Sequence, residues 1–284
     1  MAVRTLVAFL LLTAAFGQAE KPPSADVEFV CPMDPDVRTK GPAKCPRCGM
    51  KLIPGLPRFE EFRMEVSTEP SIPKPGQDVD LTFRVLDSKS NPVSSFEVVH
   101  EKLFHLFIVS QDLESFAHEH PELRPDGTFR YRYRFPKSGM YRVLGDFYPK
   151  GATPQLVPAT ILLPGDVRSA DLQQDLTPKQ GPNLKVSLRL RPEKPIAGLE
   201  TLMFFDLDSA DKLEPYLGAW GHMLAASSDM IDMVHVHPQF EDPAKTIQFN
   251  VIFPRPGVYR VWVQFQRDGM VNTVAFNVPV EQLK

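Results

Sequence analysis

The stretch HLFIVSQDLESFAHEHP, residues 105–121, decides the fold because the chain carries it twice. It recurs without a gap, 117 residues later, as HMLAASSDMIDMVHVHP at residues 222–238. A second shared stretch follows each copy, FPKSGMYRVLGDF from Phe135 and FPRPGVYRVWVQF from Phe253, here 118 residues apart. The sequence therefore predicts a duplicated domain of roughly a hundred residues.

Each copy keeps three histidines at matching places, which we call the first triad (His105, His118 and His120) and the second triad (His222, His235 and His237). Residues 103–110 and 116–120 are predicted as the strands of a hairpin. If its turn centres between Asp112 and Leu113, His105 faces His120, and His118 shares that face because it lies two residues away. Three imidazoles on one face could hold Cu(II) or Zn(II) and leave one coordination position open.

A structural explanation of these histidines stays open. His105 could bond a backbone carbonyl in both copies, and the His-Pro pairs could simply close a turn. His100 could add a fourth ligand in the first copy, but Leu217 stands at its place in the second.

The rest of each copy favours short antiparallel strands. The segments FRMEVSTE and DVDLTFRVLD alternate apolar and polar residues, and 29 prolines with frequent turn signals argue against long helices. Further strands are expected at 127–135, 140–148 and 156–163. About seven short strands per copy predict a mainly β protein with two tandem antiparallel immunoglobulin-like β-sandwich domains, residues 59–165 and 183–284. Residues 166–182 are predicted as a linker, and Tyr141 and Tyr259 as core and corner residues.

The N-terminus predicts export. Arg4 precedes an apolar run and a small-residue end at Gly17 to Ala19, which is typical of a secretory signal peptide over residues 1–19. A retained membrane anchor is the alternative, although the run is short for a bilayer span. We expect a periplasmic or secreted protein without a transmembrane segment after signal removal. A net charge of −3 and no long basic run disfavour nucleic acid as a partner.

All three cysteines lie within 18 residues, in FVCPMDPDVRTKGPAKCPRCGMKLIPG. Cys45 and Cys48 form a CxxC knuckle that can hold one metal ion, and Cys31 supplies a third thiolate. Met33 and Met50 place thioether sulfur beside them, and soft sulfur ligands favour Cu(I), with zinc as the competitor. The alternative is a Cys45–Cys48 disulfide with Cys31 left free.

Residues 28–56 resemble the heavy-metal-binding domain, a short module of metal efflux adaptors and metal-transporting ATPases. Its pattern is CPMHP, a Gly-Pro turn and CPxCGM with a final Leu-x-Pro. Thirteen positions match: Cys31, Pro32, Met33, Pro35, Gly41, Pro42, Cys45, Pro46, Cys48, Gly49, Met50, Leu52 and Pro54. Asp34 stands where that family usually has His, so the site has either lost a ligand or uses the Asp34 carboxylate.

These features predict an exported heavy-metal-binding protein for copper handling or homeostasis, without catalysis. Cu(I) is expected at the cysteines and Cu(II) or Zn(II) at the triads, with a metal efflux or transport system as a possible partner. The alternative is a periplasmic scaffold or adaptor of such a system, with structural histidines. An enzyme is disfavoured because the sequence has no Ser-His-Asp signature, Gly-rich phosphate loop or HExxH motif.

Overall fold

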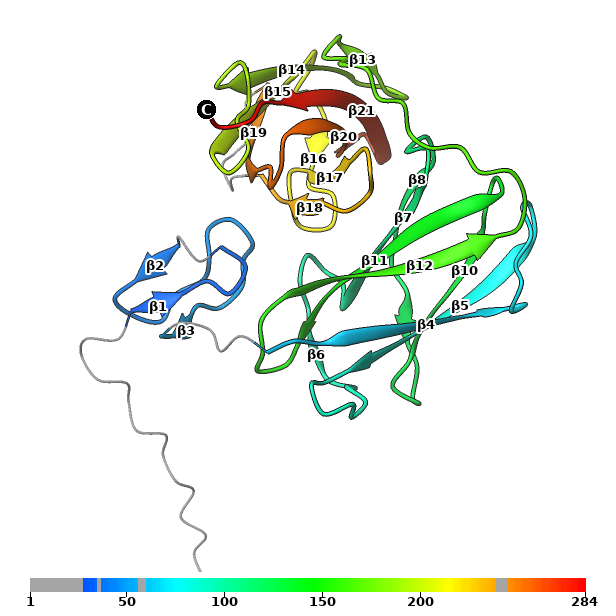
Figure 1. The fold of residues 1–284 in the computed structure, drawn as a ribbon. Helices are drawn as coiled ribbons and strands as arrows, with labels where there is room; N and C mark the ends of the chain where they lie inside the picture. Colours follow the sequence, from blue (N-terminus) through cyan, green and yellow to red (C-terminus); the bar gives the residue numbers. More distant parts are fainter. Residues whose placement is uncertain (1–27, 35–36, 56–59, 239–244) are drawn as a thin grey trace, which may run out of the picture.

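The computed structural model describes residues 28–34, 37–55, 60–238 and 245–284 (Figure 1). Every regular element within these ranges is a β-strand, which confirms the predicted fold class. The predicted signal peptide lies outside the described residues. Across the described ranges we find no helix long and apolar enough to cross a membrane.

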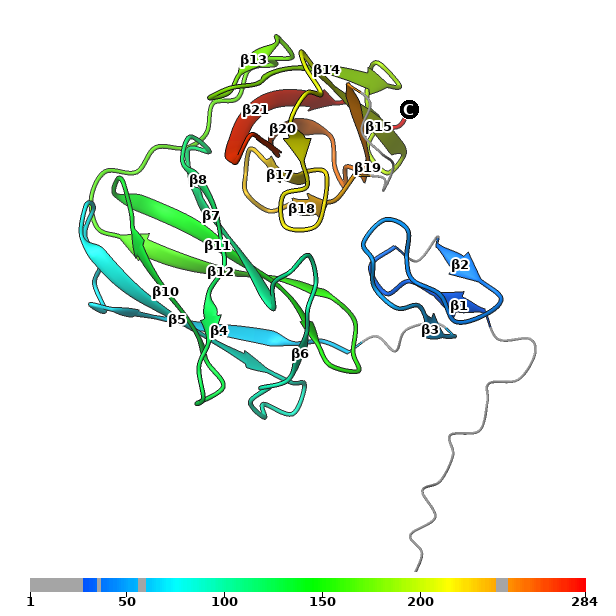
Figure 2. The same cartoon turned by 180° about the vertical axis from the view of Figure 1, so that it is seen from behind.

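The cysteine module is a small three-stranded antiparallel sheet. Its central strand β1 (Phe29–Val30) pairs with β2 (Arg38–Thr39) on one side and β3 (Ile53–Pro54) on the other. The module packs against the first domain, because Tyr148 joins the buried cluster that contains the three cysteines (the blue segment in Figures 1 and 2).

The first domain is a sandwich of two antiparallel sheets. One has the order β4-β5-β10-β9, formed by Arg63–Glu69, Asp78–Leu86, Phe129–Arg134 and Glu122–Leu123. The other has the order β12-β11-β7-β8, formed by Gln155–Leu163, Gly139–Pro149, Phe104–Ser110 and Phe116–Glu119, with β6 (Phe96–Glu97) beside β11. This order is that of an immunoglobulin-like fold, with strands A-B-E-D in one sheet and G-F-C-C′ in the other.

The second domain repeats this plan. Its first sheet is β13-β14-β15-β19, formed by Lys179–Gln180, Lys185–Arg191, Glu200–Leu207 and Thr246–Ile252. In its second sheet β20 (Gly257–Arg267) lies between β21 (Met270–Val280) and β17 (His222–Ser227), and β18 (Met233–Val236) is at the edge. The short strand β16 (Leu213–Glu214) also pairs with β20.

Tyr141 and Tyr259 are corner residues, as predicted. Both side chains are fully buried, and each hydroxyl donates a 3.0 Å hydrogen bond to a carbonyl four residues upstream, that of Lys137 and that of Arg255. This tyrosine corner pins the start of strand β11 or β20 to the preceding loop. Both domains have this corner, and in the second the Tyr259 hydroxyl also lies 2.9 Å from Asp232 Oδ2.

The two domains pack through the outer faces of their second sheets. Phe107 and Leu144 of the first domain share a buried cluster with Leu224 and Trp262 of the second. Trp262 also stacks on Phe116, with ring centroids 4.9 Å apart. Strands β7 and β17 are therefore buried along their whole length, on both faces.

Residues 166–182, predicted as the linker between the copies, make contacts with the second domain and with the domain interface. Asp175 pairs with Asn277, and strand β13 adds to the first sheet of the second domain. Leu172 packs into the domain interface. These contacts are single bridges and a two-residue strand, which leave no periodic pattern in the sequence.

Candidate metal centres

The cysteine module brings its sulfur atoms and one carboxylate together. Cys31 Sγ lies 3.4 Å from Cys48 Sγ, and Asp34 Oδ2 lies 3.3 Å from Cys45 Sγ and 3.7 Å from Cys31 Sγ. One donor atom from each of the four residues lies within 4.8 Å of the others. Bonds of about 2.3 Å to a tetrahedral ion would separate two thiolates by about 3.8 Å, so this donor set fits a bound metal.

The predicted ligands of this module occupy one buried cluster. All three cysteines are free thiols, not a Cys45–Cys48 disulfide. Met50 is buried among them and Met33 packs against the cluster. Asp34 stands among the thiols, so the carboxylate takes the place at which the family usually has His.

Charge in the module favours a cation. Hydrogen bonds from Cys31 and Cys48 lower the pKa of the Cys45 thiol to about 2. Hydrogen bonds with Cys31 and Cys45 raise the pKa of Cys48, and the hydrogen bond to Cys45 raises the pKa of Cys31 to about 11. Burial, with the Cys45 charge, raises the pKa of Asp34 to about 6. One thiolate is thus held by two protonated thiols, and a soft cation would displace those protons on binding.

The first triad converges as the hairpin register predicted. Leu106 pairs with Glu119, which places His105 opposite His120. His105 Nδ1 lies 3.1 Å from His118 Nε2 and 3.2 Å from His120 Nε2. Bonds of about 2.0 Å to a tetrahedral ion would separate nitrogen donors by about 3.3 Å, so the three atoms match one coordination sphere.

Hydrogen bonds at the outer nitrogens fix where the protons are. His105 Nε2 donates to the carbonyl oxygen of Val99 over 3.0 Å, and His118 Nδ1 donates to Gln264 Oε1 over 2.7 Å. The amide of Gln264 is oriented by its own bond to Thr273. The inner nitrogens of His105 and His118 therefore carry lone pairs that face one another, an arrangement that a shared cation stabilises.

The second triad repeats this arrangement atom by atom. His222 Nε2 donates to the carbonyl oxygen of Tyr216 over 3.0 Å, and His235 Nδ1 bonds the Asp146 carboxylate. The three remaining nitrogens, His222 Nδ1, His235 Nε2 and His237 Nε2, are buried without a partner. They are the equivalents of the three converging atoms of the first triad, and they also lie within 4.8 Å of one another. Buried nitrogens rarely lack a partner, so this set also fits a metal ion.

The structural explanation and the metal-binding explanation are therefore compatible. The bond of His105 to a backbone carbonyl is present in both copies. Such a bond at the outer nitrogen is also what orients a metal-ligating histidine.

The triads are joined through the domain interface. Gln264 of the second domain orients His118 of the first, and Asp146 of the first orients His235 of the second. Asp146 and Gln264 stand at equivalent places, 118 residues apart. The rings of His118 and His222 have centroids 5.3 Å apart, so the two triads lie ring against ring.

Burial favours the neutral form of five of these imidazoles. It lowers the pKa of His105 to about 4 and that of His120 to about 3, and it lowers the pKa values of His118, His222 and His237 well below the ordinary value. Burial alone would raise the pKa of Asp146, but the hydrogen bond from His235 outweighs it, and that pKa is lowered. Neutral imidazole is the form that binds a metal.

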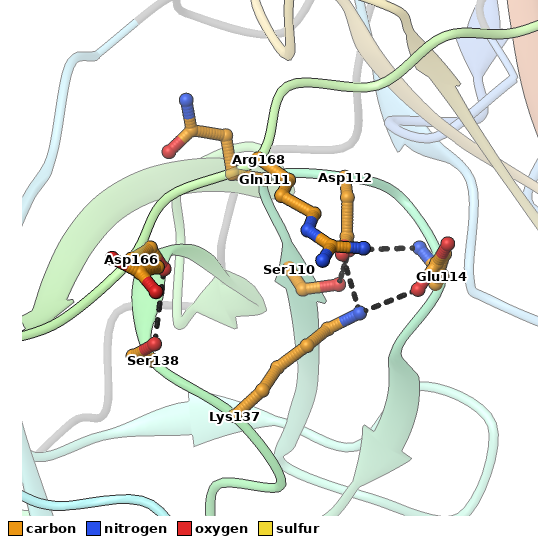
Figure 3. A pocket seen from close by; sticks show the side chains of 9 residues that line it. Ser110, Gln111, Asp112, Glu114, Lys137, Ser138, Asp166 and Arg168 are labelled. Carbon is orange, nitrogen blue, oxygen red and sulfur yellow. Dashed lines mark hydrogen bonds and ion pairs between the residues drawn. The ribbon is translucent and has the colours of Figure 1, made fainter.

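The other repeated polar residues have a structural role. Ser110 Oγ donates to Asp112 over 2.6 Å, as Ser227 Oγ does to Asp229, and so closes the hairpin turn. Lys137 reaches over to Asp112 and Glu114, at one side of a surface pocket (Figure 3). These side chains bond one another and make no hydrogen bond or ion pair with the triads.

Three residues that contact the triads were not among the predicted site residues: Asp146, Gln264 and His100. Asp146 and Gln264 contact histidines more than eighty residues away in the sequence. No local sequence pattern predicts such contacts. The non-alternating apolar runs of β7 and β17 could have indicated a covered outer face. His100 was set aside because Leu217 replaces it, yet it lies beside the second triad, with ring centroids 3.8 Å from those of His237.

Comparison with known proteins agrees with this organisation. The family described as "Heavy metal binding domain" matches residues 29–54, and "Domain of unknown function (DUF8832)" matches twice, over 59–162 and 169–282. No curated protein matches the chain.

Solved structures to which the chain is similar include the Escherichia coli adhesin FdeC. The match has 13% identity, covers 80% of this chain and 68% of that one, and has a TM-score of 0.27. The fibronectin(III)-like modules of Clostridium thermocellum CbhA match at 12% identity over 77% and 95%, with a TM-score of 0.22. The immunoglobulin-like assignment rests on the strand order given above. Because its two matches span most of the sequence, the chain belongs to the family described as Domain of unknown function (DUF8832), in two tandem copies behind a heavy-metal-binding domain.

Proposed function

We propose that this chain is an exported heavy-metal-binding protein that handles copper without catalysing a reaction. The cysteine module would hold a soft ion, Cu(I), and the triads would hold Cu(II) or Zn(II). One observation carries the proposal: in both triads the outer nitrogens of two histidines are engaged in hydrogen bonds, and matching inner nitrogens converge.

Export is supported by the signal-like residues 1–19 and by the restriction of cysteine to one short module. The matching heavy-metal-binding domain supports capture of a soft ion. We propose a metal efflux or transport system in the same compartment as the partner that delivers or receives the ion.

Metal content of the untagged protein tests this function. After growth with copper and zinc, mass spectrometry should find metal bound to the purified full-length chain. Replacing all three cysteines by serine should remove the soft ion and leave the nitrogen-bound ions. A protein that takes up neither copper nor zinc would contradict the proposal and favour a scaffold with structural histidines. Oxygen turnover by the copper-loaded protein would contradict the non-catalytic role.

A further inference from the structure

The nearest rings of the two triads are as close to one another as the rings within a triad. Across the domain interface, the ring of His222 lies 5.3 Å from that of His118 and 5.9 Å from that of His105, measured between centroids. Within the second triad, the rings of His222 and His235 are also 5.9 Å apart. The imidazoles of both domains therefore form one continuous cluster.

These ring contacts limit how far apart two bound ions can lie. The donor nitrogens of each triad lie within 4.8 Å of one another, so each triad has its own set of three ligands for one ion. An ion bonded at about 2 Å to an imidazole nitrogen lies about 3 Å from the centroid of that ring. Because the centroids of His118 and His222 are 5.3 Å apart, the two ions cannot be more than about 12 Å apart.

The groups that orient the triads carry little charge to offset two ions. His105 and His222 donate to backbone carbonyls, and His118 donates to the neutral amide of Gln264. Asp146, bonded to His235, is the one carboxylate among these four acceptors. Two divalent ions would bring four positive charges into a shell of hydrogen-bond acceptors that holds one negative charge.

Repulsion between two divalent ions at this separation is large. Two doubly charged ions about 12 Å apart repel one another enough to change an affinity about tenfold, even at the dielectric constant of bulk water. His105 and His222 are only 2% and 1% exposed. Because the effective dielectric constant is lower in a protein interior and salt screens buried charges less, the repulsion here should be at least that strong.

Ordering of the interface by the first ion is the effect that would oppose this repulsion. A first ion that fixed loose rings would help a second ion to bind. However, the hydrogen bonds that orient His105, His118, His222 and His235 are all present in this structure, and the donors of both triads already converge. A first ion has little left to order, so repulsion should dominate.

We infer that the two triads form one dinuclear centre in which the ions repel one another, so that one divalent ion binds tightly and the second remains exchangeable. The carboxylate of Asp146 favours the second triad for the first ion. Because the repulsion scales with the product of the two charges, two Cu(I) ions would repel one another four times less than two Zn(II) ions. The centre therefore fills more readily with a monovalent metal ion. This inference rests on the proposed function.

The test uses the full-length chain with the three cysteines replaced by serine, so that only nitrogen-bound ions are counted. Zn(II) is titrated in competition with a chromophoric chelator into this chain and into two further variants of it, H120A and H237A, which each keep one intact triad. Each of these variants should bind one ion tightly. The overall constant for binding two ions to the starting chain should be at least about tenfold smaller than the product of the two single-triad constants.

Cu(I), titrated without oxygen into the same three proteins, separates charge repulsion from a change of shape. Repulsion predicts that the logarithm of the deficit for Cu(I) is about one quarter of that for Zn(II). A second readout needs no single-triad variant: at two Cu(II) ions per chain, electron paramagnetic resonance should show dipolar coupling between the two spins.

The possible failures are distinguishable. A two-ion constant for Zn(II) equal to the product of the single-triad constants, or Cu(II) spins without dipolar coupling, would overturn the dinuclear centre and leave the proposed function intact. Equal deficits for Zn(II) and Cu(I) would overturn repulsion as the cause. A starting chain whose triads bind no ion would overturn both the inference and the proposed function.

Discussion

At the scale of single residues, the outer nitrogen of each oriented histidine decides what its inner nitrogen can do. Val99 and Tyr216 offer carbonyl oxygens, Gln264 offers an amide oxygen, and Asp146 offers a carboxylate. All four are hydrogen-bond acceptors, so each draws the ring proton outward. The inner lone pairs are left for a metal ion.

Asp146 therefore should control the affinity of the second site. The substitution D146N keeps the shape of the side chain and removes its charge, so we expect Zn(II) affinity at the second triad to fall by about 10- to 100-fold. The first triad, which Gln264 orients, should change little. Competition titration of the full-length cysteine-free variant measures both affinities, and an equal loss at both sites would contradict this assignment.

The buried imidazoles also predict how stability depends on pH. The pKa of His105 is lowered to about 4 and that of His100 to about 3 in the folded metal-free chain, whereas unfolded histidines titrate near 6.5. Below pH 6.5 the unfolded state binds more protons, so the free energy of unfolding should fall as the pH drops from about 6.5 to 4.

Each affected histidine contributes up to about 1.4 kcal/mol per pH unit in that window. Urea unfolding with a chelator present, at pH 7 and at pH 5, measures this effect. A stability that does not change between these pH values would contradict the burial of neutral imidazoles.

At the scale of elements, strands β7 and β11 illustrate how closely the first sandwich is packed. A Cβ atom added at Gly145 would lie 2.5 Å from the ring of Phe104 and 2.6 Å from Met64 Sδ. We expect G145A to destabilise the protein by about 1–3 kcal/mol through overpacking. Urea unfolding checks this, and the double variant G145A/F104L should recover part of the loss.

The hairpins were the most predictable elements. Two histidines that alternate on a short strand, opposite a third beyond a polar turn, fix the register of β7 and β8, and Leu106 does pair with Glu119 as that register requires. The outer contacts of the same strands were not predictable. Sequence periodicity reports which face is apolar, but it does not report which distant surface covers that face.

At the scale of the whole molecule, duplication explains why the two sites meet. Each domain presents the same sheet face, and the two faces pack on one another through Phe107, Leu144, Leu224 and Trp262. The sequence indicated two similar domains and two triads, but the pairing of the triads depends on how the domains dock. Asp146 and Gln264 gain their roles only at that level.

Docking and metal affinity should therefore be coupled. Trp262 stacks on Phe116 across the interface, and the neighbouring β20 residue Gln264 reaches His118. In W262A we expect both triads to bind Zn(II) at least about tenfold more weakly. Loosening the interface should disturb both hydrogen bonds that cross it, Gln264 to His118 and Asp146 to His235. The corner variant Y259F, which removes a hydroxyl distant from the triads, serves as the control and should leave both affinities unchanged.

The most direct measurement is anomalous diffraction from crystals of the full-length protein grown with Zn(II). We predict two anomalous peaks at the domain interface, one among the nitrogens of His105, His118 and His120 and one among those of His222, His235 and His237. Histidine rings turned toward one another or toward water, with no anomalous peak between them, would contradict the account.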